Sequence, residues 1–560
     1  MTQNVGTSGR VLDETGRPLA GLLVSVHNRN LMGPDDLLGT AFTDPEGRYD
    51  VRYPPEAYTR FLVTRPDLQV TIHDAAGIRF LAATEKVPSV GAEVQAMPDL
   101  TVPRAYAYGW LVTVGEAEPT CLSMGNDVAF LVDGEAAFAA LTEAVDRAQR
   151  SVYLTQFMFE PDFETTFEEG PANGRRLVDA LLDADARGVD VRVLIRETPV
   201  LRDSSTTLPT FFAKARDGAH NIRIQTYPLP LHTLHAKAVV VDGEEAFLIG
   251  QPFEQRYWDT RAHHAEELRR APGRPPLHDV SIRLRGPAAG DVGAFVAELW
   301  NCRQDHDPMP EPTRPGPVGR HAVQIVRTVP PSQLPRREGG EFGILEAYER
   351  AFAAAEQFVY IETQYFTSGA ITEALLKALR KNPDLEAILV LNTTVDVPTY
   401  ISWQNRRVRE LLHPDVRGRV GVFTLASMRG SPQPPTPIYV HSKASVVDDR
   451  WATVGSANLD GISLESAYEF GLQNKCNLDL NAVVFDGTDG LTPATGAVRG
   501  LRCSLWAEHL GCTAKDVAER PPGGWLRPWR EAAELNQALL VKEQRLARGF
   551  VLPYLEHELP

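Results

Sequence analysis

Basic residues are scarce in this sequence. The 57 lysines and arginines stand against 73 aspartates and glutamates, which gives a net charge of −16 at pH 7. A protein that holds nucleic acid regardless of base sequence neutralises the phosphates with a basic face. An acidic surface also repels anionic lipid headgroups. The charge therefore argues against nucleic acid and against strongly anionic membranes as partners.

Cysteines and long apolar segments are scarce as well. The five cysteines lie far apart, lack metal-ligand spacing and are odd in number, so buried or free thiols are expected and no metal site is predicted. The N-terminus has neither a basic start nor an apolar segment, and no stretch approaches the length of a membrane span. As written, the chain is expected to be soluble and cytoplasmic, with leaderless export left open.

One pattern occurs twice in the chain. Residues 235–242 read His-Ala-Lys-Ala-Val-Val-Val-Asp, and residues 441–448 read His-Ser-Lys-Ala-Ser-Val-Val-Asp. A single copy is weak evidence, because short patterns with free spacers arise by chance. Two copies, each running into β-branched residues, indicate two equivalent strands.

Strand geometry places the polar residues of each copy together. Alternate side chains of a strand share a face, so His235 points the same way as Lys237, and His441 the same way as Lys443. The motif aspartates come at the end of each strand, where a turn is expected. They are Asp242 and Asp448, and we expect them to tie the turn.

Two imidazoles and two ammonium groups are sufficient to cleave a phosphodiester without a metal or another cofactor. One imidazole attacks phosphorus and forms a covalent phosphohistidine, while the other protonates the leaving oxygen. The ammonium groups stabilise the negative charge that grows on the phosphate oxygens. The two copies therefore predict one active site at which both motifs meet.

The sequence resembles the phospholipase D superfamily over about residues 125–515. Besides the two motifs, the resemblance rests on residues 152–157 (Val-Tyr-Leu-Thr-Gln-Phe), 181–194, His278-Asp279, 359–366 (Val-Tyr-Ile-Glu-Thr-Gln-Tyr-Phe), Gly455-Ser456-Ala457-Asn458 and 501–511. It implies that His235 is the nucleophile and that His441 is the general acid and then the general base. Chemistry alone is symmetric on this point.

The resemblance also implies roles for neighbouring polar residues. The lysines of the two motifs would bind the non-bridging phosphate oxygens, and Ser456 and Asn458 would add hydrogen bonds to them. Each histidine needs a carboxylate on its far nitrogen to fix the tautomer. By resemblance, Asp279 would orient His441 and Glu469 would orient His235.

The first half departs from the family pattern after its motif. It reads Gly250-Gln251-Pro252-Phe253, where the second half has Gly-Ser-Ala-Asn. Gln251 could donate a hydrogen bond to the substrate, whereas Phe253 could not. This difference favours an asymmetric pocket with one apolar wall. A replacement of the usual residues that affects only packing fits the sequence equally well. Tyr257 and Trp258 could extend that wall or stack on a quaternary ammonium group, or they could belong to the core.

The sequence before residue 105 has a different character. Short apolar runs separated by glycine and proline turns, as in 9–26 and 43–51, favour a small antiparallel β-sandwich. The pattern resembles carboxypeptidase-regulatory or transthyretin-like modules, which implies a docking or stabilising role without catalysis.

The expected fold is α/β, with two pseudo-symmetric phospholipase D α-β-α lobes preceded by the β-sandwich. The domains predicted are 1–105 (sandwich), 106–318 (first lobe) and 319–560 (second lobe with a C-terminal helical tail); proline-rich residues 307–317 link the lobes.

The leading functional hypothesis is a phospholipase D. It would hydrolyse glycerophospholipids such as phosphatidylcholine or phosphatidylethanolamine at a membrane or micelle surface, and would transfer the phosphatidyl group to other alcohols. Two alternatives stay open. One is a phosphodiesterase or nuclease of the same superfamily, and the other is a secreted antibacterial lipase effector that a partner binds through the N-terminal domain.

Overall fold

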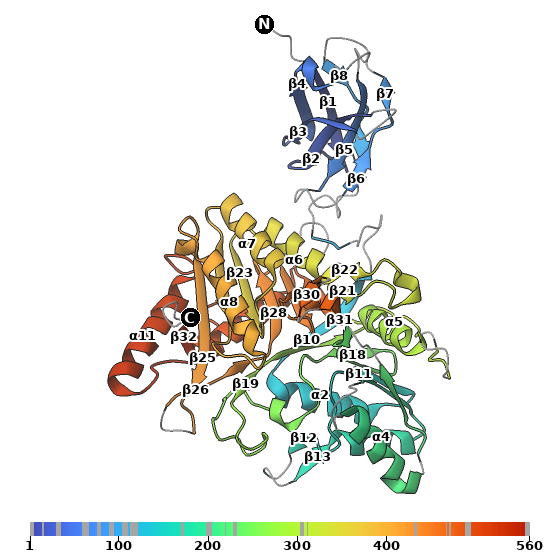
Figure 1. Ribbon diagram of the computed structural model, residues 1–560, viewed down its shortest axis with the longest axis vertical. Helices are drawn as coiled ribbons and strands as arrows, with labels where there is room; N and C mark the ends of the chain where they lie inside the picture. Colours follow the sequence, from blue (N-terminus) through green and yellow to red (C-terminus); the bar gives the residue numbers. More distant parts are fainter. Residues whose placement is uncertain are drawn as a thin grey trace. The chain divides into compact units, whose positions relative to one another are not determined.

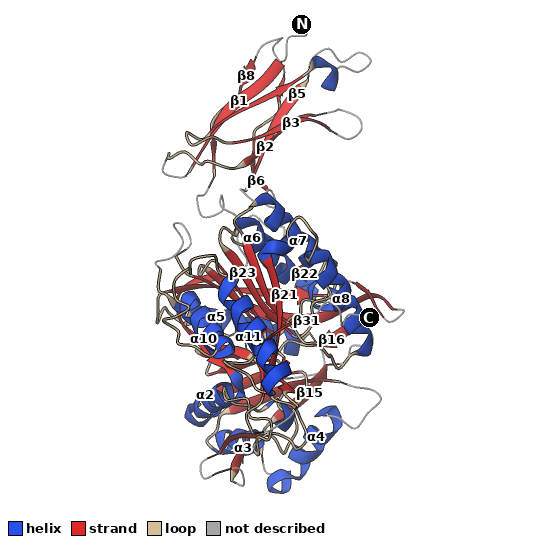
Figure 2. Cartoon of the chain, turned by 90° about the vertical axis from the view of Figure 1, so that its left-hand side faces the viewer, coloured by secondary structure: helices blue, strands red, loops and turns tan. Residues whose placement is uncertain are grey.

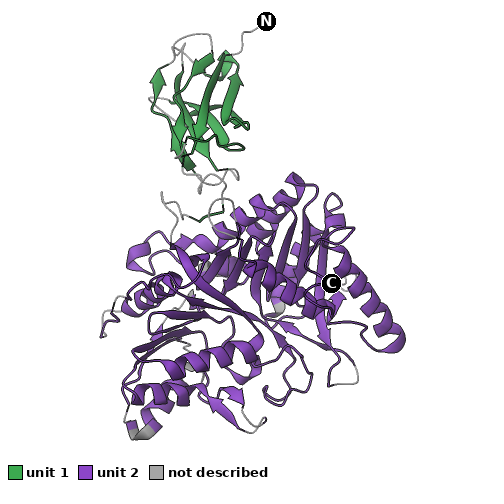
Figure 3. Ribbon diagram, turned by 180° about the vertical axis from the view of Figure 1, so that it is seen from behind, with its two compact units in different colours: residues 1–119, 489–491 green, residues 120–488, 492–560 purple. Residues whose placement is uncertain are grey.

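The computed structural model divides the chain into two compact units, which are described separately (Figure 3). Unit 1 comprises residues 1–119 and 489–491, and unit 2 comprises 120–488 and 492–560. The structure describes residues 5–554 except 14–15, 30–34, 59–65, 75–79, 89–93, 103–109, 113–120, 168–169, 171–172, 198–203, 219, 228–231, 303–306, 311, 431–433, 466, 470–471 and 488–493. The expected boundary at residue 105 lies outside the described residues, and the expected lobes belong to unit 2 apart from residues 106–119 and 489–491.

Unit 1 is a small β domain with two sheets. One sheet contains β1 (Val5–Leu12), β4 (Arg48–Tyr53), β8 (Val94–Ala96) and β9 (Leu100–Thr101); the other contains β2 (Leu23–Asn28), β3 (Asp36–Phe42), β5 (Asp67–His73), β6 (Phe80–Ala83) and β7 (Val87–Pro88). Residues of β4 alternate between exposed and buried, and Tyr49, Val51 and Tyr53 enter the shared core. Most pairings are antiparallel, whereas β8 and β9 pair with β1 in parallel.

Unit 2 contains the same succession of elements twice (Figure 1). The first lobe has β10 (Leu122–Val132), α2 (Asp133–Arg147), β11 (Ser151–Gln156), α3 (Leu177–Ala186), β14 (Asp190–Arg196), α4 (Ser204–Lys214), β15 (Arg223–Tyr227), β17 (Ala238–Val241), β18 (Glu245–Leu248), β20 (Val280–Arg285) and α5 (Pro287–Asn301). The second lobe has β21 (His321–Val329), α6 (Gly343–Ala354), β23 (Phe358–Thr363), α7 (Gly369–Lys381), β24 (Glu386–Val390), α8 (Pro398–Leu411), β25 (Val420–Ser427), β28 (Lys443–Val447), β29 (Trp451–Gly455), β31 (Leu472–Phe485) and α10 (Ala497–Leu510).

The sheet pairings repeat with the elements. In the first lobe, β11 pairs in parallel with β14 and antiparallel with β17, which continues antiparallel through β18 to β20. In the second lobe, β23 pairs in the same senses with β24 and β28, and β28 continues through β29 to β31. Strand β10 pairs with both β20 and β21, so the two lobes share one continuous sheet. The predicted two-lobe α/β fold with a small antiparallel β domain before it is confirmed.

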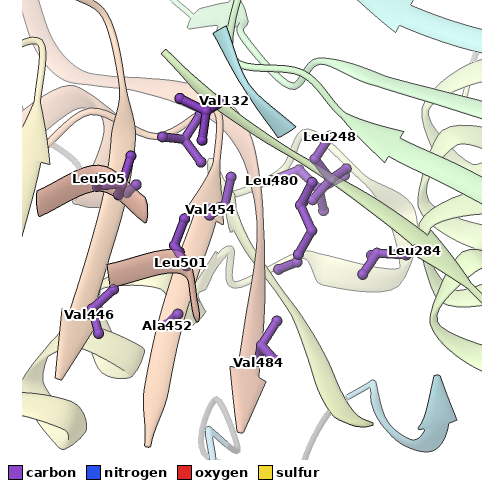
Figure 4. Close-up of a cluster of buried hydrophobic side chains, with 14 of the residues drawn as sticks. Val132, Leu248, Leu284, Val446, Ala452, Val454, Leu480, Val484, Leu501 and Leu505 are labelled. Atoms are coloured by element: carbon purple, nitrogen blue, oxygen red, sulfur yellow. The ribbon is translucent and has the colours of Figure 1, made fainter. Parts of the chain in front are cut away.

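Helices cover both faces of the sheet. In β17, Val239 and Val241 pack towards α2, α3 and α4, while Ala238 and Val240 pack towards α5. Strands buried on both faces need apolar residues at every position, which explains the valine-rich runs after the motif histidines. Figure 2 shows the second-lobe strands between α6–α8 and α10–α11. One core cluster joins the two lobes, and Leu248 of the first lobe lies beside Leu480 of the second (Figure 4).

The remaining elements are short or terminal. They are β12 (Glu164–Phe167), β13 (Gly174–Arg176), β16 (His232–Leu234), β19 (Leu277–His278), β22 (Glu341–Phe342), β26 (Thr436–Pro437), β27 (Tyr439–Val440), α9 (Gly461–Leu464), β30 (Ala467–Glu469), α11 (Arg527–Glu543) and β32 (Val551–Pro553). Helix α11 buries Trp529 against the second lobe and is the helical part of the predicted C-terminal tail. All five cysteines are free thiols. Among the described helices, none is long and apolar enough to cross a membrane.

Candidate active site

His235 is positioned by a strand of the opposite lobe. Strand β16, which leads into His235, pairs in parallel with β31, and the His235 N–H donates to the Leu478 carbonyl at 2.9 Å. The next residue along β31 is Asp479. Its Oδ1 lies 2.7 Å from His235 Nδ1.

His441 is positioned in the equivalent way. Strands β19 and β27 pair in parallel, and the His441 N–H donates to the His278 carbonyl at 2.8 Å. The next residue is Asp279, whose Oδ2 lies 2.6 Å from His441 Nδ1. The contact expected between Asp279 and His441 is therefore present. In both halves the backbone of one lobe fixes a histidine beside a carboxylate of the other.

The expected partner of His235, Glu469, is replaced by Asp479. Glu469 pairs with Leu472 near the tip of the β30–β31 hairpin, and its side chain lies outside the described residues. Asp479 comes seven residue steps after Leu472, which corresponds to roughly 23 Å along β31. No local pattern marks Asp479 as the partner of His235, which becomes apparent only from the pairing of β16 with β31.

Ser456 supports this carboxylate. Its hydroxyl donates to Asp479 Oδ1 at 2.6 Å and accepts from the Leu480 N–H at 3.0 Å. The serine that was expected to bind the substrate phosphate is thus engaged in holding Asp479. Asn458 is buried, and its Oδ1 has no hydrogen-bond partner among the described residues.

The two motif lysines are buried beside their histidines. Lys237 Nζ donates to the His235 carbonyl at 3.0 Å. Lys443 Nζ donates to the His441 carbonyl and, at 2.9 Å, to Gln364 Oε1. Gln364 belongs to the stretch 359–366, and its role as an acceptor for Lys443 was not predicted.

Burial and mutual repulsion keep the positive charge at the site low. Burial, aided by the charge of Lys237, lowers the pKa of His235 to about 4, although Asp479 opposes this shift. Burial and the two lysines hold the pKa of His441 well below its usual value. Burial lowers the pKa of Lys443 to about 8. The lysines of both lobes lower the pKa values of both histidines, so the four groups form one site. A bound anion would relieve this repulsion, and the site therefore suits a phosphate group.

The motif aspartates lie away from the imidazoles. The Asp242 carboxylate accepts hydrogen bonds from the backbone N–H groups of residues 149–151, at the start of β11. The Asp448 carboxylate accepts from those of residues 356–358, at the start of β23. Both aspartates have a positive φ, 55° and 54°. Both carboxylates tie turns to the sheet, and in the described part of the chain neither forms a hydrogen bond or ion pair with a motif histidine.

Two of the expected substrate-binding residues belong to the core. The Phe253 ring is fully buried, 5.3 Å from the Phe159 ring and stacked on Phe163 at 5.8 Å. Trp258 is buried, and its Nε1–H donates to the Thr165 carbonyl at 3.0 Å. Phe253 packs among Phe138, Phe159 and Phe163, and the Trp258 ring lies 5.2 Å from the Phe167 ring, so neither forms the expected pocket wall.

Tyr257 and Gln251 do lie at the site. The Tyr257 ring is 4.9 Å from the His441 ring, and Gln251 Nε2 donates to the Tyr257 carbonyl at 3.3 Å. Gln251 therefore holds the backbone of Tyr257. Beside the other histidine, the Phe157 ring lies 5.3 Å from the His235 ring. The Arg196 guanidinium lies 3.9 Å from the centre of the Phe157 ring.

A carboxylate near His441 was missed by the sequence analysis. Tyr439, two residues before His441, donates its hydroxyl to Asp396 Oδ1 at 2.9 Å, and Tyr365 donates to the same oxygen. Gln364 Nε2 in turn donates to the Tyr439 hydroxyl at 3.0 Å. Asp396 lies in a loop with no motif of its own, so only the tertiary structure connects it to the site.

Comparisons with known proteins agree with this geometry. The family model "Cardiolipin synthase, PLD-like domain" matches residues 141–261 and 348–478, and the model "Phospholipase D" matches residues 429–534. Phospholipase D A of Dictyostelium discoideum is 26% identical over 69% of this chain and 35% of its own length. Cardiolipin synthase B of Escherichia coli K12 is 26% identical over 65% of this chain and 77% of its own length.

Among solved structures, the phosphatidylserine synthase of Haemophilus influenzae aligns with 68% of this chain and 86% of its own, at 13% identity and a TM-score of 0.46. The chain spans about a third of the Dictyostelium relative and 54% of phospholipase D zeta 2 of Arabidopsis thaliana.

The family models cover one motif in each lobe, and the two lobes repeat one fold around paired histidines. This chain belongs to the phospholipase D superfamily.

Proposed function

We propose that this protein is a phosphodiesterase of the phospholipase D type, which cleaves glycerophospholipids through a covalent phosphohistidine. The observation that carries the proposal is the crossed pairing of His235 with Asp479 and of His441 with Asp279. Each carboxylate occupies Nδ1, which leaves Nε2 of both imidazoles for the substrate.

The reaction follows from the roles of the two Nε2 atoms. Nε2 of His235 attacks phosphorus and the bond from phosphorus to the headgroup oxygen breaks, while Nε2–H of His441 gives its proton to that oxygen. In the second step His441 takes a proton from water or from an acceptor alcohol. The resulting oxygen nucleophile attacks phosphorus, the phosphorus–nitrogen bond breaks, and His235 is regenerated.

The carboxylates and lysines stabilise both transition states. Asp479 supports the positive charge that develops on the His235 ring after attack. Lys237 and Lys443 supply charge to the non-bridging oxygens from a water-poor site, where electrostatic interactions are stronger than in water. Asn458 would add a hydrogen bond to the same oxygens.

The surroundings of His441 favour a cationic headgroup. The leaving alcohol must lie beside the general acid, and here Tyr257, Tyr439 and the carboxylate of Asp396 gather. An aromatic face and a carboxylate are groups that bind ammonium ions. This supports phosphatidylcholine or phosphatidylethanolamine as substrate, with His441 on the headgroup side and His235 as nucleophile. The names of the relatives, phospholipase D and cardiolipin synthase, support a phospholipid substrate as well.

A nuclease activity receives less support. Arg196 is the basic residue beside the motif residues, and the arginines of α8 are paired, since Arg406 and Arg407 both form ion pairs with Glu410. These pairs, together with the net charge of −16, argue against a basic track for a nucleic-acid backbone along the described residues.

The test measures headgroup release from vesicles that contain phosphatidylcholine and phosphatidylethanolamine, with a single-stranded DNA digest run in parallel. We expect lipid cleavage by the wild type, no cleavage by His235→Ala or His441→Ala, and normal cleavage by His413→Ala, which removes an exposed imidazole. Cleavage of DNA without cleavage of lipid would overturn the proposal in favour of the nuclease.

A further inference from the structure

A second group of histidines and carboxylates lies behind Asp279, apart from the reacting groups. Its inner members are Asp133, His263, His278 and Glu508. Asp133 begins α2, His278 ends β19 and Glu508 belongs to α10 of the second lobe. The side chains of Asp133, His263 and His278 have no exposed surface, and that of Glu508 retains 5%. The reaction described above uses none of these groups.

The four side chains converge at the spacing of metal ligands. His263 Nε2 lies 3.1 Å from Glu508 Oε1 and 3.7 Å from Asp133 Oδ2, and His278 Nδ1 lies 3.4 Å from the same oxygen of Glu508. A tetrahedral ion with bonds of about 2.0–2.1 Å separates its ligand atoms by roughly 3.3 Å. Two imidazole nitrogens and two carboxylate oxygens also form a donor set that suits zinc.

The far side of each imidazole is held in the manner typical of metal-binding histidines. Asp259 Oδ2 lies 3.4 Å from His263 Nδ1, and Glu362 Oε2 lies 3.1 Å from His278 Nε2. A carboxylate on the outer nitrogen fixes the ring and makes the inner nitrogen a better donor to a metal.

Two of the inner atoms are buried without a hydrogen bond. Asp133 Oδ1 accepts from the Asp279 N–H at 3.1 Å, whereas Asp133 Oδ2 has no hydrogen-bond partner among the described residues. His278 Nδ1 is also without an assigned hydrogen bond, although it lies 3.1 Å from Asp133 Oδ1. Buried polar atoms of this kind call for a partner, and both face the point where the four ligands converge.

The charge of the network is also consistent with a divalent cation. Four carboxylates, those of Asp133, Asp259, Glu362 and Glu508, are joined to the histidines. Two arginines pair with them: Arg270 with Asp259 at 2.9 Å, and Arg261 with Glu508 at 2.5 Å. With neutral imidazoles, two negative charges remain. Protons on two of the imidazoles would also balance these charges, so an experiment must separate the two states.

An ion can reach the cluster from the surface. Glu508, Arg261 and Cys512 line a surface cavity of about 520 Å³ on the second lobe. Arg261, whose side chain is exposed, pairs with Glu508, so Glu508 is the member of the cluster that lies nearest to this cavity.

We propose that Asp133, His263, His278 and Glu508 bind one divalent transition-metal cation of the zinc class, which ties α10 of the second lobe to the first lobe. Such an ion has a structural role and takes no part in bond cleavage. It would hold Asp133, whose backbone N–H donates to the Asp279 carbonyl at 2.8 Å, and so would steady the residue that orients His441.

The test measures metal binding without lipid. The full chain is purified without a metal-affinity step, stripped with a chelator and titrated with Co²⁺, whose visible absorption reports tetrahedral coordination, and then with Zn²⁺. We expect one equivalent of each metal to bind, with Zn²⁺ displacing Co²⁺ and raising the unfolding temperature. His263→Gln and Glu508→Gln should each weaken binding by at least tenfold, and His413→Gln should leave it unchanged.

Absence of a cobalt band and of zinc binding in the folded wild type would overturn the proposal and assign the balancing charge to protons. A cobalt band that persists undiminished in folded His263→Gln would overturn it too. If a variant fails to fold, the wild-type titration still decides. Loss of lipid cleavage with an intact cobalt band would overturn only the proposed function.

Discussion

Asp279 and Asp479 occupy equivalent places in the two lobes, and each holds the histidine of the opposite lobe. Both follow a residue whose carbonyl accepts the backbone N–H of that histidine, at 2.8 and 2.9 Å. Both carboxylates lie within 2.7 Å of Nδ1. The relationship makes each half-site dependent on the other lobe, so neither lobe is expected to be active alone.

The first prediction concerns Asp479. Asp479→Asn should lower kcat by about 10²–10⁴-fold with little change in KM, because loss of a carboxylate that fixes the tautomer has an effect of this size in related acid–base systems. Steady-state assays on phosphatidylcholine micelles would measure it. A normal kcat in Asp479→Asn, with a large loss in Glu469→Gln, would contradict this account and support Glu469 as the residue that orients His235.

A substitution at the second motif aspartate should affect stability instead of chemistry. Asp448→Asn keeps a residue that tolerates positive φ but removes the charge that three backbone N–H groups share. We expect the free energy of unfolding to fall by about 1–3 kcal/mol, as measured by urea denaturation. At a temperature where the variant is folded, kcat should stay within about threefold of wild type. Asp242→Asn is the matched control, and its effect should be smaller since that carboxylate is more exposed.

Binding of a phosphodiester should be coupled to proton uptake. At pH 7 both imidazoles of the free protein are neutral, because the pKa of His235 is lowered to about 4 and that of His441 lies well below its usual value. The negative charge of a bound diester offsets the lysines and raises the pKa of His441, which must be protonated to act as the acid.

Dimethyl phosphate suits this measurement because it does not itself titrate near neutral pH. Calorimetry in buffers of different ionisation enthalpy should show uptake of up to about one proton per site, rising as the pH falls from 8 to 6. Near pH 6, where Lys443 with its pKa of about 8 is already protonated, the uptake should be lost in His441→Gln. Binding without any exchange of protons in the wild type would contradict the role assigned to His441.

Asp396 should contribute to headgroup preference. Its carboxylate is exposed, and exposed ion pairs contribute at most about 1 kcal/mol, so Asp396→Asn should lower kcat/KM for phosphatidylcholine by about two- to fivefold. Cleavage of phosphatidylglycerol should not decrease. Asp415→Asn removes an exposed carboxylate that pairs with Arg380 and serves as the control. Equal losses on both lipids would place the headgroup elsewhere.

The repeated pattern in the sequence was sufficient to predict the fold class and the four motif side chains of the site. Alternation along a strand places His235 with Lys237 and His441 with Lys443 without any knowledge of the tertiary structure. The valine-rich runs after each motif predict strands covered on both faces, which β17 and β28 are.

Contacts between lobes could not be predicted in this way. Asp479 reaches His235 because β16 pairs with β31 in a particular register, and no local pattern encodes that register. The sequence pattern allows Phe253 a place in the pocket and leaves Trp258 between the pocket and the core. Both rings lie in the core, Phe253 beside Phe138, Phe159 and Phe163, and Trp258 beside Phe167. The cluster around His263 and His278 likewise draws on segments far apart in sequence.

The most direct test of the mechanism is to trap the covalent intermediate. His441→Ala should still allow His235 to attack a phospholipid with an activated leaving group, but it cannot activate water for the second step. After incubation with such a substrate labelled at phosphorus and a rapid quench, we predict an acid-labile, alkali-stable label on the peptide that contains His235, and none in the His235→Ala protein. Label on another residue, or turnover without any covalent label, would contradict the assignment of His235 as the nucleophile.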